Sequence, residues 1–159
     1  MSKKKIPPAV EADKIHLFSI NVFKSNLETS EAFLDAPKKV EGFDFGLARN
    51  FAHNLKEKGT RIRLYFTMEA VDEEKQILGL KAEYGIEFHF HIDNFEDFVK
   101  INKKKELDMD AAYAGTLLGI AYSTSRGIIL ERIQGTFFDA IILPVLDPIK
   151  VAVEGEEKS

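Results

Sequence analysis

The sequence predicts an α+β fold, in which a four-stranded antiparallel sheet carries a long helix and a shorter C-terminal helix packed on one side. Three observations lead to this prediction. Residues 14–92 contain four long segments in which apolar residues recur at every second position, separated by turn-forming segments. A helical apolar pattern runs from about residue 110 to residue 133. An apolar run interrupted by Pro144 and Pro148 then leads into a short final helix.

The length and composition are those of one ordinary globular domain. The chain has 159 residues, of which 45% are hydrophobic and 30% charged. We expect a flexible N-terminal tail over residues 1–13, one domain over residues 14–150 and an acidic C-terminal tail over residues 151–159.

Charge and composition argue against several classes of function. The net charge of -4 does not attract nucleic acid or anionic lipid. The lack of cysteine excludes disulfides, zinc thiolate sites and thiol nucleophiles. The N-terminal residues lack the apolar run of a secretory signal, and no segment reaches the roughly 20 apolar residues of a membrane-spanning helix. We therefore expect a cytoplasmic protein that neither binds nucleic acid nor inserts into a membrane.

The first strand is expected over residues 14–28 and carries apolar residues on both faces. Simple alternation divides them into one set with Phe18, Ile20 and Val22 and an opposite set with Ile15, Leu17, Phe23 and Leu27. Because both sets are apolar, we expect both faces of this strand to be covered.

The next three strands are expected over residues 43–56, 61–71 and 76–92. The alternation of apolar and polar residues is clearest in the first of them. This pattern is typical of a strand with one solvent-exposed face. Short turn signals join the three strands, which therefore form an antiparallel meander, and the first strand is added as the fourth.

The second half of the chain is expected to be mainly helical. Residues 94–107 combine one helical turn with a charged loop, after which Asp108 or Asp110 can cap the long helix. Small residues between positions 111 and 121 make the first part of this helix slim, so that another helix or a sheet can approach it closely. Gly135 is a natural stop for the helix, and residues 137–146 continue in an extended or loop conformation.

Few residues suggest chemistry. His89 and His91 share a strand face with Glu87, a spacing that can chelate a metal ion. Two histidines on an exposed strand face are more often solvated, so we expect no metal site. Asp108 and Asp110 are better explained by helix capping than by acid-base catalysis. We expect no catalytic residue and no cofactor.

Apolar residues exceed what one long helix can cover in a monomer. The chain contains 13 phenylalanines, which supply large apolar area without a polar group. The surplus indicates oligomerisation, a binding groove, or both, although packing in the core remains the alternative for any single residue.

The segment after the long helix resembles a chaperone signature. Gly135-Thr136-Phe137, followed by Ile142-Leu143-Pro144-Val145, resembles the C-terminal signature of the SecB export chaperones. In that family a helix ends in a Gly-Thr-Phe turn, and a crossover loop with an apolar-x-Pro-Val run precedes a second helix. The order of elements over residues 14–150 is also similar to that of SecB.

The resemblance implies an ATP-independent chaperone, or holdase, that binds unfolded polypeptides in apolar grooves between the sheet and the crossover loop and serves protein export. It also implies a homotetramer, built as a dimer of dimers through the first strand and the long helix. The client-binding candidates are Ile20, Tyr84, Phe88, Phe137, Phe138, Ile141 and Pro144. The candidates for a subunit interface, all on the long helix, are Ala111, Ala114, Gly115, Leu118 and Tyr122.

The sequence departs from SecB at the positions expected to dock the export motor SecA. SecB proteins carry an acidic patch on the exposed sheet face, whereas the corresponding positions here include Lys24 and Lys81, with Glu28 retained. This difference speaks against SecA as a partner. The alternative hypothesis is then a SecB-like chaperone that stabilises the antitoxin of a toxin-antitoxin system.

Two other hypotheses remain open. A long helix against an antiparallel sheet also describes hot-dog thioesterases, for which Asp108, Asp110 or Glu131 would be the catalytic acid. A non-catalytic oligomeric adaptor for a single partner is the other alternative.

Overall fold

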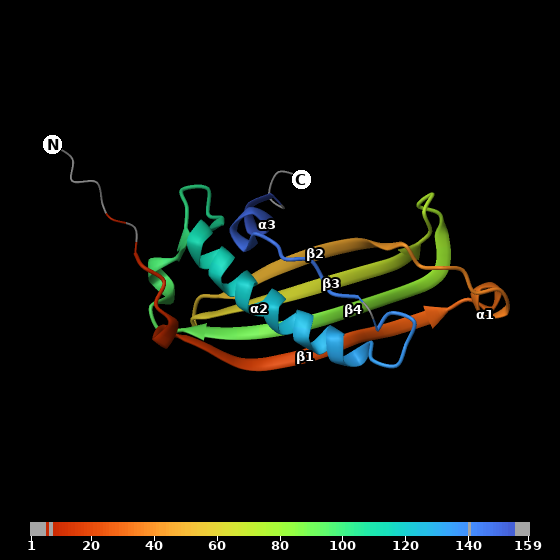
Figure 1. The fold of residues 1–159 in the computed structure, drawn as a ribbon. Coiled ribbons are helices and arrows are strands. Elements are labelled where there is room, and N and C mark those ends of the chain that lie inside the picture. The colour runs from red at the N-terminus through yellow and green to blue at the C-terminus, as the bar shows by residue number, and fades with distance from the viewer. Residues whose placement is uncertain (1–5, 7, 140, 155–159) are drawn as a thin grey trace.

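A computed structural model describes residues 6, 8–139 and 141–154, which form a four-stranded antiparallel sheet with two helices on one face (Figure 1). In sequence order the strands are β1 (Ile15–Thr29), β2 (Gly42–Asn54), β3 (Gly59–Val71) and β4 (Ile77–Ile92). Their order in the sheet is β1-β4-β3-β2. The long helix α2 (Ala111–Arg132) and the C-terminal helix α3 (Pro148–Glu154) cover the same face. The predicted fold class is confirmed.

The central strands β3 and β4 form the floor of the core, because every second residue on them is apolar. The buried residues on this face are Ile62, Leu64, Phe66, Met68 and Ala70 on β3, and Leu80, Ala82, Tyr84, Ile86, Phe88, Phe90 and Ile92 on β4. The register places them directly across from one another, as in the pair Leu64 and Ile86. The alternation in the sequence therefore predicted the inner face of these strands.

Strand β1 does not follow simple alternation, because its pairing with β4 shifts register twice, at Phe18 and at Phe23. Each extra residue turns the side chains that follow to the opposite face. The face covered by α2 therefore carries Leu17, Ile20 and Val22, whose β4 partners are all buried. Phe18 and Phe23 lie together on the other face of the sheet. The assignment of faces from alternation was wrong at these positions.

The two phenylalanines of the open face, meaning the face without α2 and α3, have aromatic neighbours on other strands. The ring of Phe18 lies 5.8 Å from that of His89. The ring of Phe23 lies over Gly85 and meets Tyr65 edge to face at 5.5 Å. Because Gly85 has no side chain, the Phe23 ring can lie directly on the backbone of β4.

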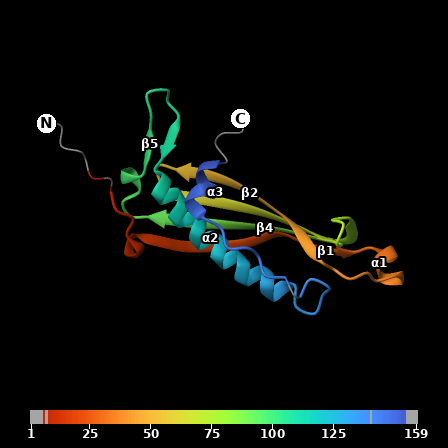
Figure 2. The same ribbon diagram turned by 45° about the horizontal axis from the view of Figure 1, so that its top comes forward.

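Three short elements fall in segments that were expected to be loops. The helix α1 (Glu31–Asp35) begins after Ser30, whose hydroxyl accepts a hydrogen bond from the Phe33 amide at 3.2 Å. The strands β5 (Val99–Ile101) and β6 (Leu107–Met109) form a hairpin beside the start of α2 (Figure 2). With three residues each, these strands are too short to show periodicity.

Helix α2 begins as predicted at an aspartate. The carboxylate of Asp110 accepts a hydrogen bond from the Tyr113 amide at 2.9 Å, which satisfies one of the free donors of the first turn. The Tyr113 side chain is fully buried, and its hydroxyl is 2.8 Å from that of Thr60 on β3. This contact fixes the N-terminal end of α2 to the sheet.

The slim part of α2 is covered by α3 of the same chain. A side chain at Gly115 would reach within 2.5 Å of the Ile149 side chain and 3.0 Å of its Cα atom, so the two helices are in close contact here. Gly119 similarly faces Pro148. Leu118 is also buried. The close approach of another helix, which the small residues predicted, therefore occurs within the chain.

Helix α3 extends past the expected end of the domain. Its first turn is capped by the Asp147 carboxylate, and it continues to Glu154 with Ala152 buried. Arg49 of β2 donates hydrogen bonds to the carbonyl oxygens of Val151 and Ala152 at the other end of the helix. Residues 151–154 thus belong to a packed helix, and residues 155–159 of the predicted tail lie outside the described part of the chain.

The contact at Gly115 leads to a prediction. In Gly115→Ala the added methyl group collides with Ile149 and displaces α3, which we expect to lower the free energy of unfolding by about 1–3 kcal/mol. The matched control is Gly127→Ala, where no atom lies within 4 Å of the new methyl group. This variant should be stabilised by up to about 1 kcal/mol, because alanine favours the helix over glycine. Urea unfolding followed by circular dichroism measures both values, and equal stability of the two variants would contradict the close helix contact.

Candidate functional site

The segment that joins α2 to α3, residues 136–147, is here named the crossover segment. It begins with a turn after Gly135, which has the positive φ angle of 76° that favours glycine. The Thr136 hydroxyl donates to the carbonyl oxygen of Ile133 at 2.7 Å and accepts a hydrogen bond from the Phe138 amide at 3.1 Å. The Gly-Thr pair therefore ends the helix and sends the chain back along the sheet, as Figure 1 shows.

The crossover segment is held to the core by alternate residues. Ile141 and Leu143 are buried, whereas Ile142 is 77% exposed and Val145 is 83% exposed. The Tyr122 hydroxyl of α2 donates a hydrogen bond to the Pro144 carbonyl oxygen and fixes the middle of the segment. Because one set of side chains is anchored, the other set is presented to solvent at defined positions.

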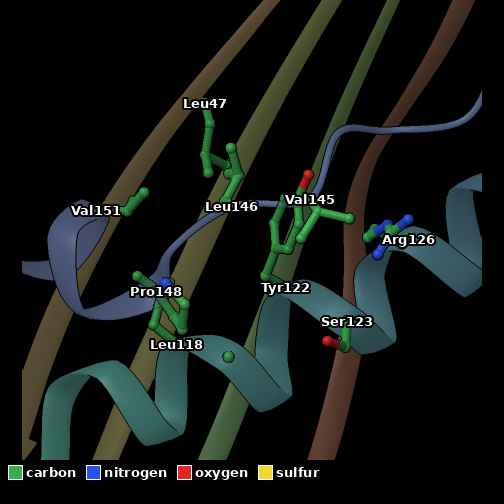
Figure 3. Close-up of a pocket in the computed structure, with 10 residues that line it drawn as sticks. Leu47, Leu118, Tyr122, Ser123, Arg126, Val145, Leu146, Pro148 and Val151 are labelled. Atoms are coloured by element: carbon green, nitrogen blue, oxygen red, sulfur yellow. The ribbon is translucent and has the colours of Figure 1, made fainter. Parts of the chain in front are cut away.

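Two adjoining cavities lie between α2 and the crossover segment, and together they form the feature that we name the groove. The cavity nearer α3, of about 150 Å³, is lined by Leu47, Leu118, Gly119, Tyr122, Ser123, Arg126, Val145, Leu146, Pro148 and Val151 (Figure 3). The other cavity, of about 240 Å³, is lined by Ser123, Arg126, Gly127, Ile129, Leu130, Ile133, Ile141, Ile142 and Leu143. They share Ser123 and Arg126, so the groove is continuous along one side of α2.

Comparison with solved structures decides what this arrangement resembles. No family model matches the sequence, and no curated protein matches it. A SecB-like chaperone of Mycobacterium tuberculosis, Rv1957, was solved in complex with a ChAD peptide from the Rv1956 HigA1 antitoxin. It superposes on this chain with a TM-score of 0.55 and 15% sequence identity, covering 85% of this chain and 92% of the other.

The chain has a SecB-like fold. A protein of unknown function from Streptococcus agalactiae is also similar, with a TM-score of 0.40, 11% identity and coverage of 83% of this chain and 96% of the other. The match to Rv1957 confirms, for the fold, the resemblance inferred from the Gly135-Thr136-Phe137 turn and the Ile142-Leu143-Pro144-Val145 run.

The structure distributes the client-binding candidates between the surface and the core. Phe137 is 52% exposed, Ile20 is 42% exposed and Pro144 is also exposed. The side chains buried in the core are those of Tyr84, Phe88, Phe138 and Ile141. Of these, Ile141 lines the groove with its remaining surface. The strand residues Tyr84 and Phe88 belong to the floor under α2, and the accessible candidates are Phe137 and Pro144 of the crossover segment and Ile20 of β1.

The interface candidates on α2 are mostly covered by the chain itself. The side chains of Ala114, Leu118 and Tyr122 are buried, and Gly115 is in contact with α3. Ala111 is exposed at the start of the helix. Gly115 packs against Ile149 of α3 in the same chain, and a subunit interface on this stripe stays a prediction.

Sequence reasoning missed the part of the groove that α2 contributes. Gly119, Ser123, Arg126 and Leu130 recur at intervals of four, three and four residues, which places them on one side of the helix. This spacing was visible in the sequence, but nothing in it showed that the crossover segment runs back along this side.

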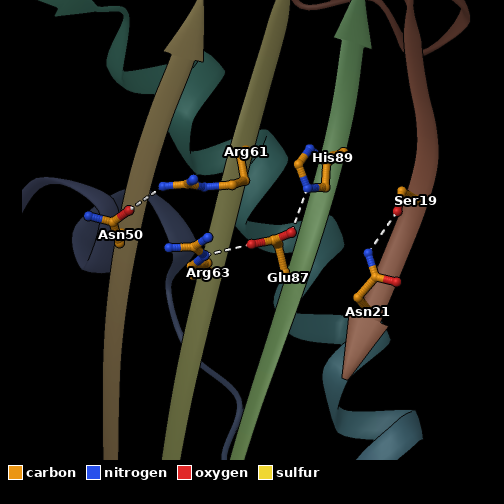
Figure 4. Close-up of polar contacts among 7 residues, drawn as sticks. All are labelled: Ser19, Asn21, Asn50, Arg61, Arg63, Glu87 and His89. Atoms are coloured by element: carbon orange, nitrogen blue, oxygen red, sulfur yellow. Dashed lines mark hydrogen bonds and ion pairs between the residues drawn. The ribbon is translucent and has the colours of Figure 1, made fainter. Parts of the chain in front are cut away.

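The open face of the sheet is polar along its middle (Figure 4). Glu87 accepts one hydrogen bond from Nε of Arg63 and pairs with His89, each at 2.6 Å. These contacts, the one with His89 first, hold the pKa of Glu87 below its usual value. His91 lies 3.0 Å from the Glu57 carbonyl oxygen. Within the described residues, no group of three or more histidines and carboxylates is arranged to hold a metal ion.

The positions compared with the SecA-docking patch of SecB form an ion triad. Glu83 lies 2.7 Å from the Lys24 ammonium group and 3.1 Å from that of Lys81. These contacts, the one with Lys24 first, lower the pKa of Glu83. The carboxylate is thus flanked by two cations, which leaves this part of the open face without an acidic patch.

The candidate acids of the thioesterase hypothesis occupy unrelated positions. Asp110 is the cap of α2, whereas Asp108 and Glu131 are exposed.

In the part of the chain that the structure describes, no helix has the length and hydropathy to cross a membrane.

The anchor between Tyr122 and Pro144 can be tested by removing one hydroxyl group. Tyr122→Phe keeps the ring in the core but loses the hydrogen bond to the crossover segment. We expect the free energy of unfolding to fall by about 1 kcal/mol, with faster amide hydrogen exchange over residues 141–147. Exchange in β3 and β4 serves as the internal control. Unchanged protection of the crossover segment would show that this bond does not hold it.

Proposed function

We propose that this chain is an ATP-independent holdase that binds non-native polypeptide segments in the groove beside the crossover segment. The observation that carries the proposal is the exposure of Ile142 and Val145 beside two cavities that are lined mainly by apolar residues. The SecB-like fold supports it, because a protein with this architecture was solved with a bound peptide.

The physical basis of such binding is the removal of apolar surface from water. Each Å² of buried apolar surface contributes about 25 cal/mol, and this contribution does not depend on the orientation of the two surfaces. A chain that exposes apolar residues in many different sequences is therefore held without a dedicated recognition motif. Neither nucleotide hydrolysis nor a catalytic residue is needed, and we propose that the protein is not an enzyme.

We also propose that the protein is a homotetramer, a dimer of dimers, in which β1 takes part in subunit contacts. This strand lies at the edge of the sheet, so the hydrogen-bonding groups of its outer side have no partner strand within the described residues. It exposes Leu17 and Ile20 on the face covered by α2 and Phe18 and Phe23 on the open face. Pairing with a second copy would satisfy the strand edge and cover both apolar sets.

An antitoxin or a related endogenous protein is a more suitable client than an export precursor delivered to SecA. The triad of Lys24, Glu83 and Lys81 places two cations and one carboxylate where an acidic patch was expected, so its net charge is positive. The similar chaperone of Mycobacterium tuberculosis was solved with an antitoxin peptide. We propose that the chain acts in the cytoplasm, where such a client is synthesised.

The holdase function is tested by aggregation of a chemically unfolded client in the absence of ATP. The purified protein should suppress light scattering at near-stoichiometric ratios. The double variant Ile142→Ser and Val145→Ser should suppress it severalfold less, because the exposed apolar side chains that meet the client are gone.

The matched control for this experiment is Ile101→Ser. Ile101 is 59% exposed and lies in the β5–β6 hairpin rather than in the groove. Its substitution removes a comparable exposed side chain and should leave the activity unchanged. If the unmodified protein does not suppress aggregation, the proposed function is refuted. If the groove variant and the Ile101→Ser control lose the same share of this activity, the client does not bind in the groove.

The role of β1 is tested by the molecular mass in solution. We expect light scattering to give four times the chain mass of 18.0 kDa. The double variant Phe18→Glu and Ile20→Glu places a charge on each face of the edge strand and should yield smaller species. Ile77→Glu, at a 63% exposed position of β4, is the control and should remain tetrameric. A tetramer that survives the β1 changes would place the interface elsewhere.

A further inference from the structure

The groove contains one cationic side chain between its two cavities. Arg126 lines both of them and projects beside Val145 at the edge of the first cavity (Figure 3). It is partly buried, and among the described residues it forms no hydrogen bond and no ion pair. Ser123, one turn earlier on α2, also borders both cavities.

An unpaired guanidinium group changes what an otherwise apolar groove accepts. When a client covers Arg126, the group loses water, and this loss is costly unless the client supplies an acceptor. A carboxylate is the best replacement, because it accepts two parallel hydrogen bonds from the guanidinium group and neutralises its charge. Charge complementarity therefore favours an acidic side chain opposite Arg126.

The length of the groove sets the position of that acidic side chain. Gly119 and Ile129, which line different cavities, are ten residues apart on α2, which corresponds to about 15 Å of helix. In an extended segment, residues i and i+4 point to the same side and lie about 13 Å apart. Residue i+2 lies between them on the same side of the segment. It would therefore face Arg126, which lies between the two cavities.

We propose that the groove selects extended client segments with the pattern apolar-x-acidic-x-apolar, in which the two apolar side chains enter the two cavities and Arg126 binds the carboxylate. This inference rests on the proposed function of the groove as the client-binding site. It adds a specificity-determining residue, and it identifies the preferred client as an acidic, apolar segment rather than any apolar segment.

The test uses labelled peptides with the core Leu-Ser-Asp-Ser-Phe, together with versions in which asparagine or lysine replaces the central aspartate. Binding to the full-length protein is followed by fluorescence anisotropy at physiological ionic strength. We expect the aspartate peptide to bind severalfold more tightly than the asparagine peptide, whose amide oxygen is a neutral acceptor, and the lysine peptide to bind most weakly because it offers Arg126 no acceptor. The difference between the aspartate and lysine peptides should shrink as salt is added.

Variants of the protein identify the responsible charge. Arg126→Glu should reverse the order, so that the lysine peptide binds more tightly than the aspartate peptide. Arg132→Glu makes the same charge change on the same helix at a position that borders neither cavity, and it should retain the original order. Circular dichroism confirms that both variants are folded.

The outcomes separate this inference from the proposed function. If the aspartate and asparagine peptides bind equally, Arg126 does not select the client. If Ile142→Ser weakens the binding of both peptides, the groove remains the client-binding site. An aspartate preference that Arg126→Glu does not alter would also overturn the role of Arg126. If no peptide binds and the protein suppresses no aggregation, the proposed function itself is refuted. If Arg126 binds an acidic residue of a second copy of the chain and not of a peptide, it belongs to a subunit contact. This result would also overturn the inference.

Discussion

The close contact between α2 and α3 is the constraint on which the groove depends. Gly115 has no side chain, so Ile149 lies against the helix backbone, and α3 is held at the N-terminal half of α2. The chain leaves α2 at Gly135, at the opposite end, and must therefore run back along the helix to reach this place. The crossover segment, with its alternately buried and exposed side chains, is the consequence of this return.

The two faces of the sheet are used differently. The side covered by α2 is a continuous apolar core, in which the hydroxyl groups of Tyr113 and Thr60 satisfy each other. Burial raises the pKa of Tyr113 to about 12, so this hydroxyl stays protonated to a higher pH than that of an ordinary tyrosine. The open face instead carries ion pairs along the middle and aromatic rings near β1. Charged groups in the middle of this face and exposed aromatic rings beside β1 therefore distinguish it from the groove.

Much of the fold could be predicted from the sequence, because period-two and helical patterns are long in this chain. The four long strands, α2 and its Asp110 cap were predictable for that reason. The faces of β1 were not, because an extra residue at Phe18 or Phe23 leaves no trace in the pattern of apolar residues. The crossover segment was identified by its Gly135-Thr136 turn. The burial of Phe138 and the participation of Arg126 depend on how α2 and the crossover segment lie on the sheet, which no local pattern specifies.

The groove combines two kinds of interaction that differ in magnitude and in consequence. Burial of one large apolar side chain contributes about 1.5–3 kcal/mol, whereas an ion pair near the surface contributes about 0–1 kcal/mol. Affinity for a client must therefore come from the apolar cavities. A charge between them acts mainly through the cost of covering it with a segment that offers no acceptor. Under this arrangement Arg126 discriminates by penalising the wrong segments, so a chaperone with broad apolar affinity can still favour one kind of client.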